Sequence, residues 1–161
     1  MKDILDKLTT YNIFNYLLPC TIFVYILKEF TGFDITQTDT LIGGFLYYFV
    51  GMIISRCGSV FIEPFLRWTK FVKFEEYKDY IKASKIDAKI ELLSEVNNSY
   101  RTIISMLTLL LIAKGYKSLI DKFQINGEIS MLIIVVLLFT LFIFSYRKQT
   151  NYITKRVKAN I

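Results

Sequence analysis

Residues 41–65 read LIGGFLYYFVGMIISRCGSVFIEPF. This run is apolar and long enough to cross a bilayer, whose hydrocarbon core, about 30 Å thick, takes roughly 20 helical residues. It contains one cation, Arg56. A charge in the membrane is costly and usually faces a bundle interior or a water-filled cavity. Two interpretations stay open: Arg56 extends to the nearer membrane surface, or it lines a pore or vestibule. Pairing with Glu63 is less direct, because seven residues separate the two by about 10 Å along a helix.

Small residues recur along the same run. Gly44, Gly51 and Gly58 repeat every seven residues, and together with Ser55 they form a stripe on one face of a helix. Helices in lipid associate mainly by close packing at such residues. The sequence therefore predicts a helix-packing stripe, directed either at another helix of the same chain or at a second copy of the chain.

The composition of the whole chain favours a membrane protein without enzymatic activity. Of its 161 residues 53% are hydrophobic, the mean hydropathy is +0.41, and histidine is absent. The chain thus lacks the commonest general base and metal ligand. Its two cysteines, Cys20 and Cys57, lie in apolar runs and are expected to pack as small hydrophobes. Since paired intramembrane aspartates, an HExxH motif and a serine with its base are also missing, we expect no catalysis, metal or cofactor.

Four apolar windows predict an all-α integral membrane protein with four transmembrane helices in two hairpins. The windows are about 11–27, 41–62, 102–120 and 129–146. The expected parts are an N-terminal hairpin (1–66), a helical cytoplasmic segment (67–101), a C-terminal hairpin (102–146) and a basic tail (147–161). Pro19 predicts a kink in the first window.

The distribution of cations predicts the orientation. Fifteen Lys and Arg residues flank one side of the four windows, in the N-terminus, the central segment and the tail, whereas four flank the other side. By the positive-inside rule, both termini and the segment 67–101 face the cytoplasm.

The cytoplasmic segment combines aromatic and basic residues. Aromatic residues recur every third position from Trp68 to Tyr80, with lysines between them. This pattern is typical of an interfacial belt at anionic lipid, and it also suits a platform on which nucleotide bases stack. The segment and the start of the third window supply the candidate ligand-binding residues, which are Arg67, Lys70, Lys73, Asn97, Asn98 and Arg101.

Three stretches carry a resemblance to a known family: YNIFNYLLPCTIFVYIL (11–27), GGFLYYFVGMIISRCGS (43–59) and KIELLSEVNNSYRT (89–102). The chain resembles the small multi-pass inner-membrane proteins of bacterial antiviral defence operons, in particular the membrane effectors of Hailong systems. In those systems a nucleotidyltransferase makes short DNA oligomers that hold a membrane channel closed. The resemblance implies a homo-oligomeric channel, a tetramer by preference, in the bacterial inner membrane, with short single-stranded DNA or a nucleotide as ligand and an operon-encoded nucleotidyltransferase as partner.

Three functional hypotheses follow. The first is a homo-oligomeric channel or pore-forming effector gated by an anionic ligand on the cytoplasmic side. The second is a non-conducting membrane anchor or scaffold whose cytoplasmic segment docks a protein partner. The third is a small lipid-binding or transport component.

Overall fold

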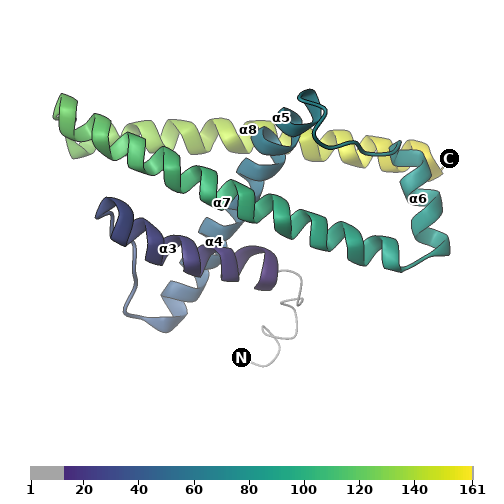
Figure 1. Ribbon diagram of the computed structural model, residues 1–161, viewed down its shortest axis with the longest axis horizontal. Coiled ribbons are helices and arrows are strands. Elements are labelled where there is room, and N and C mark those ends of the chain that lie inside the picture. The colour runs from purple at the N-terminus through teal and green to yellow at the C-terminus, as the bar shows by residue number, and fades with distance from the viewer. Residues whose placement is uncertain (1–12, 161) are drawn as a thin grey trace.

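The computed structural model describes residues 13–160, which form helices and no strand (Figure 1). This confirms the predicted all-α class for the described part of the chain. The elements in order are a π-helical turn η1 (Ile13–Leu17), α3 (Leu18–Thr31), α4 (Thr40–Cys57), a second π-helical turn η2 (Gly58–Ile62), α5 (Glu63–Trp68), α6 (Tyr77–Ile86), α7 (Lys89–Phe123) and α8 (Gly127–Asn160). The segments α4, η2 and α5 form one continuous helix of 29 residues.

The helices are arranged around α7. In Figure 1, α7 and α8 run antiparallel from their short turn at the left, while α3 lies along α7 and α4 crosses it. Residues of η2 contact both α7 and α8. Towards the left end, Lys114 of α7 donates a hydrogen bond to the backbone carbonyl of Phe30 (2.6 Å), which ties the end of α3 to the last third of α7. At the right end, α6 bridges α7 and α8.

Local sequence signals explain where these helices begin and end. Asp39 caps α4, since its carboxylate accepts hydrogen bonds from the N–H groups of Leu41 and Ile42. Gly32 ends α3 with a φ of 78°, a left-handed conformation that glycine adopts without steric cost. Asn126 caps α8, since its side-chain oxygen accepts a hydrogen bond from the N–H of Ile129.

One ion pair ties the loop between α3 and α4 to the last turn of α3. Lys28 Nζ lies 2.8 Å from a carboxylate oxygen of Asp34. The hydrogen bond from Lys28, together with two from Thr36, holds the pKa of Asp34 well below its ordinary value.

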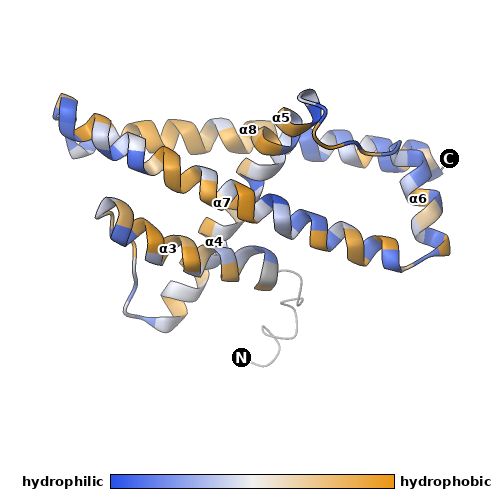
Figure 2. Ribbon diagram, in the orientation of Figure 1, coloured by the Kyte–Doolittle hydropathy of each residue, from blue (hydrophilic) through white to orange (hydrophobic). Residues whose placement is uncertain are grey.

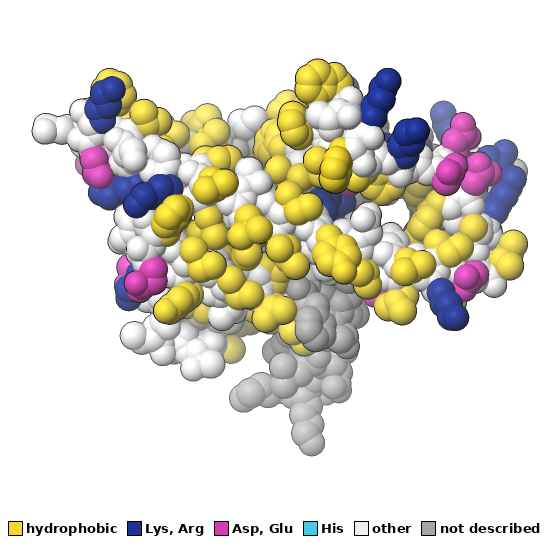
Figure 3. Space-filling view, viewed as in Figure 1, with side chains coloured by type: hydrophobic (Ala, Val, Ile, Leu, Met, Phe, Trp, Pro, Cys, Tyr) yellow, Lys and Arg dark blue, Asp and Glu magenta, His cyan; other side chains and the backbone are white. Residues whose placement is uncertain are grey.

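Three of the described helices are long and apolar enough to cross a membrane: the continuous helix Thr40–Trp68, α7 and α8. Of their most apolar windows, only 28%, 17% and 11% respectively is buried within the chain, and Figure 2 shows the apolar half of α8 lying next to the turn with α7. One face of the molecule is largely covered by hydrophobic side chains, with charged groups gathered towards its two ends (Figure 3). Apolar surface on this scale requires lipid or protein around it.

The first predicted window corresponds to η1 and α3, and its initial residues, 11 and 12, lie outside the described part. The helix changes from π to α geometry at Leu18, directly before Pro19. Because Pro19 has no N–H to bond back to a carbonyl of η1, the change of helical geometry lies where the regular backbone bonding is interrupted. Cys20 lies in the main core, which confirms its expected packing role; the core residues are Cys20, Phe23, Val24, Leu27, Ile54, Met106 and Leu110.

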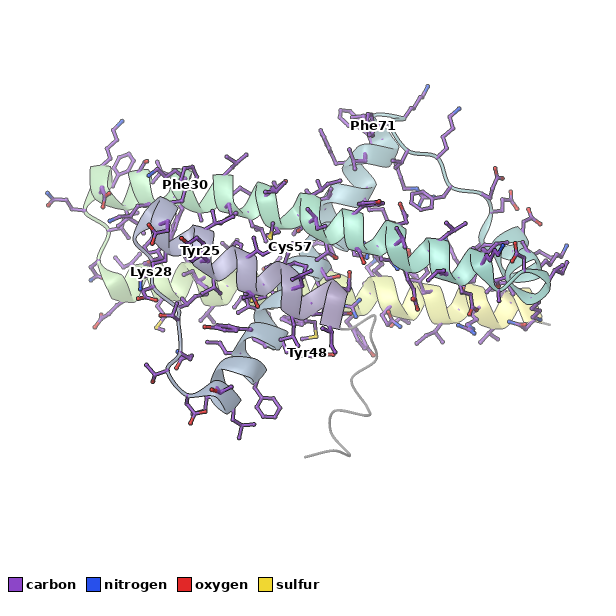
Figure 4. All side chains as sticks on the ribbon, turned by 60° about the horizontal axis from the view of Figure 1, so that its bottom comes forward. Tyr25, Lys28, Phe30, Tyr48, Cys57 and Phe71 are labelled. Carbon is purple, nitrogen blue, oxygen red and sulfur yellow. The ribbon has the colours of Figure 1, made fainter. Side chains whose placement is uncertain are left out.

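The segment 67–101 is mostly helical, as predicted, but it contains a break after α5 that the sequence did not predict. Residues 69–76 are not helical, and helix resumes only with α6 and α7. Lys70 adopts a left-handed φ of 60°, while the N–H of Lys70 bonds to the carbonyl of Arg67 and the N–H of Phe71 to that of Leu66. This is the Schellman pattern that stops a helix. Phe71, 80% exposed, extends outward from this segment (Figure 4).

Candidate functional site around a buried glutamate

The most concentrated charge in the described structure surrounds Glu63 at the start of α5. Its side chain is 8% exposed, yet three cations from three helices approach it. Arg101 of α7 places Nη1 2.6 Å from Oε2, and Lys148 of α8 places Nζ 3.2 Å from Oε1. Arg67, one turn further along α5, lies 4.0 Å from Oε1. Glu63 therefore joins α5, α7 and α8 through a single carboxylate.

The cations around Glu63 differ in how many of their N–H groups have hydrogen-bond partners. Lys148 also donates to the backbone carbonyl of Ser59 in η2 (2.5 Å). The Nε atom of Arg101 is buried without a hydrogen-bond partner in the described structure. Because one carboxylate faces three cations, the surroundings of Glu63 carry excess positive charge.

A groove of about 370 Å³ opens beside this cluster. From α5 it is lined by Glu63, Pro64 and Arg67, and from α8 by Lys148, Asn151, Tyr152 and Lys155. The four α8 residues follow the spacing i, i+3, i+4 and i+7, which places them on one helical face. Glu63 is the single acid among the lining residues and is already paired, so the groove attracts anions.

A second polar cluster lies inside the helix bundle. Thr102 of α7 donates to Asn15 Oδ1 (2.8 Å) in η1 and lies 3.2 Å from Ser55 Oγ on α4. Asn15 and Thr102 are fully buried. Ser105, one turn beyond Thr102, donates to the carbonyl of Ile54 (2.7 Å). These bonds connect three helices within the apolar region, and they satisfy polar groups that lipid would leave unpaired.

The glycine stripe divides between two environments. A Cβ on Gly51 would lie 2.1 Å from the backbone oxygen of Tyr16, and one on Gly58 would lie 3.1 Å from the backbone oxygen of Arg101. Both glycines therefore pack against helices of the same chain, as does Ser55 through its hydrogen bonds. Gly44 has no atom within 4 Å of its Cβ position. Packing within the chain is the reading that the structure supports at Gly51 and Gly58, while Gly44 is free for other contacts.

The structure brings two of the six predicted ligand-binding residues together and leaves the other four apart from them. Arg67 and Arg101 meet at Glu63. Lys70 and Lys73 lie exposed on the segment 69–76. Asn97 is exposed and Asn98 is half-buried. Within residues 13–160 the side chains of Lys70, Lys73, Asn97 and Asn98 form no hydrogen bond or ion pair. The backbone carbonyl of Asn98 accepts a hydrogen bond from Thr102.

Arg56 is half-buried on α4, and within residues 13–160 its side chain forms no hydrogen bond or ion pair. Its pairing with Glu63, which the spacing made unfavourable, is not formed, since Glu63 contacts Arg101, Lys148 and Arg67 instead.

The sequence analysis did not identify Lys148 and Lys155 as site residues, and it did not identify Glu63 as the residue at which the cations meet. A signal for Glu63 was present, because it is the single acid between Asp39 and Glu75 and ends an apolar run, where an unpaired carboxylate is costly. The face formed by Lys148, Asn151, Tyr152 and Lys155 was also readable from its spacing, although its partner helix was not.

Comparison of the chain with protein-family models, with curated proteins and with solved structures finds no match.

Proposed function

We propose that this protein is a homo-oligomeric membrane channel or pore-forming effector, gated by an anionic ligand, a nucleotide or short oligonucleotide, on the cytoplasmic side. In this proposal α3 is a fourth span, both termini face the cytoplasm, and the tetramer is the favoured assembly. The setting is the bacterial inner membrane in antiphage defence, beside an operon-encoded nucleotidyltransferase.

The observation that carries the proposal is the cationic centre at Glu63. It joins α5, α7 and α8 part-way along the two long helices, where the apolar windows 102–120 and 129–146 give way to their polar parts. An anion bound there changes the charge balance that holds these helices together. A ligand that interacts differently with two helix arrangements shifts the population between them, which is the physical requirement for gating.

The need for several copies follows from packing. The interior of one chain is filled by the apolar core and by the paired cluster of Asn15, Ser55 and Thr102. A conducting path must then form between copies, and the exposed apolar faces of α7 and α8 supply surface for such contacts. Arg56, near the inner ends of the spans, is the residue that we expect at the inner vestibule, where it favours anions.

Ion flux tests the proposal directly. Purified protein is reconstituted into liposomes, and flux is measured with and without a short oligodeoxynucleotide inside the proposed cytoplasmic compartment. We expect flux that changes with the ligand and that Arg56→Leu alters, whereas Lys122→Leu, at the α7–α8 turn, leaves it unchanged. Liposomes that stay silent under both conditions would rule out the channel. A nucleotidyltransferase gene beside this one would support the proposed ligand class.

The alternative function, a non-conducting anchor or scaffold, has one observation in its favour. Trp68, the last residue of α5, and Phe71, on the segment that follows, are 78% and 80% exposed, and they offer apolar contact to a protein partner. An anchor would show no flux, and Arg56→Leu would leave its function intact. A lipid-binding component, the third hypothesis, is distinguished by specific lipid retained at these aromatic residues on purification.

A further inference from the structure

We infer that the groove between α5 and α8 is a phosphate-binding site, with Arg67, Lys148 and Lys155 as its cations and Glu63 as an internal competitor for the bound anion. This deepens the proposed function, on which it rests for the link between binding and gating. The site differs from the predicted set, since it uses Lys148 and Lys155 of α8 and omits Lys70, Lys73, Asn97 and Asn98.

The donor set fits a phosphate group. Arg67 brings a planar guanidinium, which bonds phosphate oxygens in pairs, while Lys148 and Lys155 bring ammonium groups from positions two turns apart on α8. The amide of Asn151 and the hydroxyl of Tyr152 line the same groove and add neutral hydrogen-bonding groups. The groove volume of about 370 Å³ falls at the lower end of the range for small-molecule sites.

The distances around Glu63 indicate which contacts a phosphate would replace. Glu63 holds Arg101 at 2.6 Å, but Lys148 at 3.2 Å and Arg67 at 4.0 Å. Arg101 does not line the groove, whereas Lys148 and Arg67 do. A phosphate in the groove would therefore take Lys148 and Arg67, and Glu63 would keep Arg101. The carboxylate thus occupies the place of the anion until one binds.

This exchange has a mechanical consequence. Lys148 links α8 to Glu63 and also to the carbonyl of Ser59 in η2. When phosphate takes Lys148, the direct tie between α8 and the carboxylate is lost while α7 stays tied through Arg101. Binding at this site therefore changes how α8 is held relative to the helix Thr40–Trp68.

Two sources can supply the phosphate. Lys148 follows the apolar window of α8 by two residues, at the depth where phospholipid headgroups lie. Lys155, two turns further from that window, extends the groove toward water. A lipid headgroup and a soluble nucleotide share the chemistry that the groove recognises, and the experiment separates them.

The soluble arm measures binding of inorganic phosphate and of AMP to the full chain in an uncharged detergent, at ionic strength matched with sodium chloride, by the shift in thermal unfolding and by titration calorimetry. We expect Lys155→Ala to weaken binding about tenfold, because one charge-assisted hydrogen bond is lost. Arg156→Ala is the matched control, since it removes the neighbouring cation from another face of α8. Within residues 13–160 neither side chain forms a hydrogen bond or ion pair, so neither change disturbs the fold.

Glu63→Gln tests the competition. Because the competing charge is gone, this variant should bind phosphate more tightly than the native chain and gain more thermal stability from it. Lys155→Ala keeps the inference testable where Glu63→Gln does not fold.

The lipid arm compares nanodiscs of phosphatidylglycerol and phosphatidylcholine and counts lipids retained in native mass spectra. Retention of phosphatidylglycerol that Lys155→Ala abolishes and Arg156→Ala preserves supports the site with a lipid as its source. Binding in the soluble arm with the same dependence supports it with a nucleotide as its source. If neither arm shows binding, or if Lys155→Ala and Arg156→Ala act alike, the inference is overturned.

Flux in liposomes is measured separately, so the two ideas fail independently. If the protein binds phosphate but conducts no ions, the phosphate site is supported and the channel is ruled out. If flux depends on the ligand but is unchanged by Lys155→Ala, the channel is supported and the phosphate site is ruled out.

Discussion

At the scale of single residues, Glu63 is the group whose removal should cost the most. Its carboxylate neutralises Arg101, which is largely enclosed. Breaking a buried ion pair by removing one partner costs about 3–5 kcal/mol. We expect Glu63→Ala to lower the free energy of unfolding, measured in detergent, by an amount in this range, while Glu91→Ala, at an exposed acid of α7, has little effect.

A double variant separates charge from packing at the same place. Replacing both partners of a buried ion pair with apolar residues of similar size is often close to neutral. Glu63→Met combined with Arg101→Met should therefore recover much of the stability that Glu63→Ala loses, since Lys148 and Arg67 reach water through the groove. A double variant as unstable as the sum of the single ones would show that the pair acts independently.

Thr102 is the residue on which the inner polar cluster depends. Thr102→Val keeps the shape of the side chain but removes the donor to Asn15 Oδ1. The loss should be about 1–2 kcal/mol, because a buried acceptor is left unpaired. Thr108→Val is the matched control, since Thr108 bonds only to the carbonyl of Ile104 on its own helix. Equal losses of unfolding free energy in the two variants would mean that the cluster contributes nothing between helices.

At the scale of elements, the end of α5 is set by a lysine in a conformation that glycine prefers. A non-glycine residue in the left-handed region costs about 1–2 kcal/mol in backbone strain. Glycine removes this strain, but it also raises the conformational entropy of the unfolded chain, which offsets part of the gain in stability. Lys70→Gly should therefore stabilise the protein by about 0.5–1 kcal/mol in unfolding measurements. Lys73→Gly, in the same segment without a positive φ, should not stabilise it. A Lys70→Gly variant with unchanged stability would show that the Schellman turn carries no strain.

The three long helices and the break after α5 show which elements the apolar pattern of the sequence predicts and which it does not. The apolar windows 41–62, 102–120 and 129–146 lie within the three long helices, because continuous apolar runs in lipid leave the backbone few options except helix. The break at 69–76 was not predictable from composition. It depends on two backbone hydrogen bonds at Lys70 and Phe71, in a stretch with neither glycine nor proline to announce it.

At the scale of the whole molecule, the candidate site illustrates the limit of reading one sequence. Arg67, from the basic aromatic segment, and Arg101, from the start of the third window, were predicted as ligand-binding residues, and the structure brings both to Glu63. Their meeting point, Glu63, and the third helix, through Lys148, follow from how α5, α7 and α8 pack, which is tertiary information that spacing along one helix does not hold. Of the predicted packing stripe, Gly51 and Gly58 are covered by other helices of the chain and Gly44 is open, a division that the sevenfold repeat does not reveal.

That division leads to a prediction about assembly. Because Gly51 and Gly58 already pack within the chain, a contact between copies along this stripe has to use Gly44. A bulky Gly44→Ile should then shift the proposed oligomer to smaller species in native mass measurements, without lowering the stability of the chain itself. Gly115→Ile is the matched control, since Gly115 on α7 also has no atom within 4 Å of its Cβ position. Gly51→Ile should instead destabilise every chain, because the new side chain would meet the backbone of Tyr16. If Gly44→Ile left assembly unchanged, the stripe would serve the single chain alone, and any contact between copies would have to lie on the exposed apolar faces of α7 and α8.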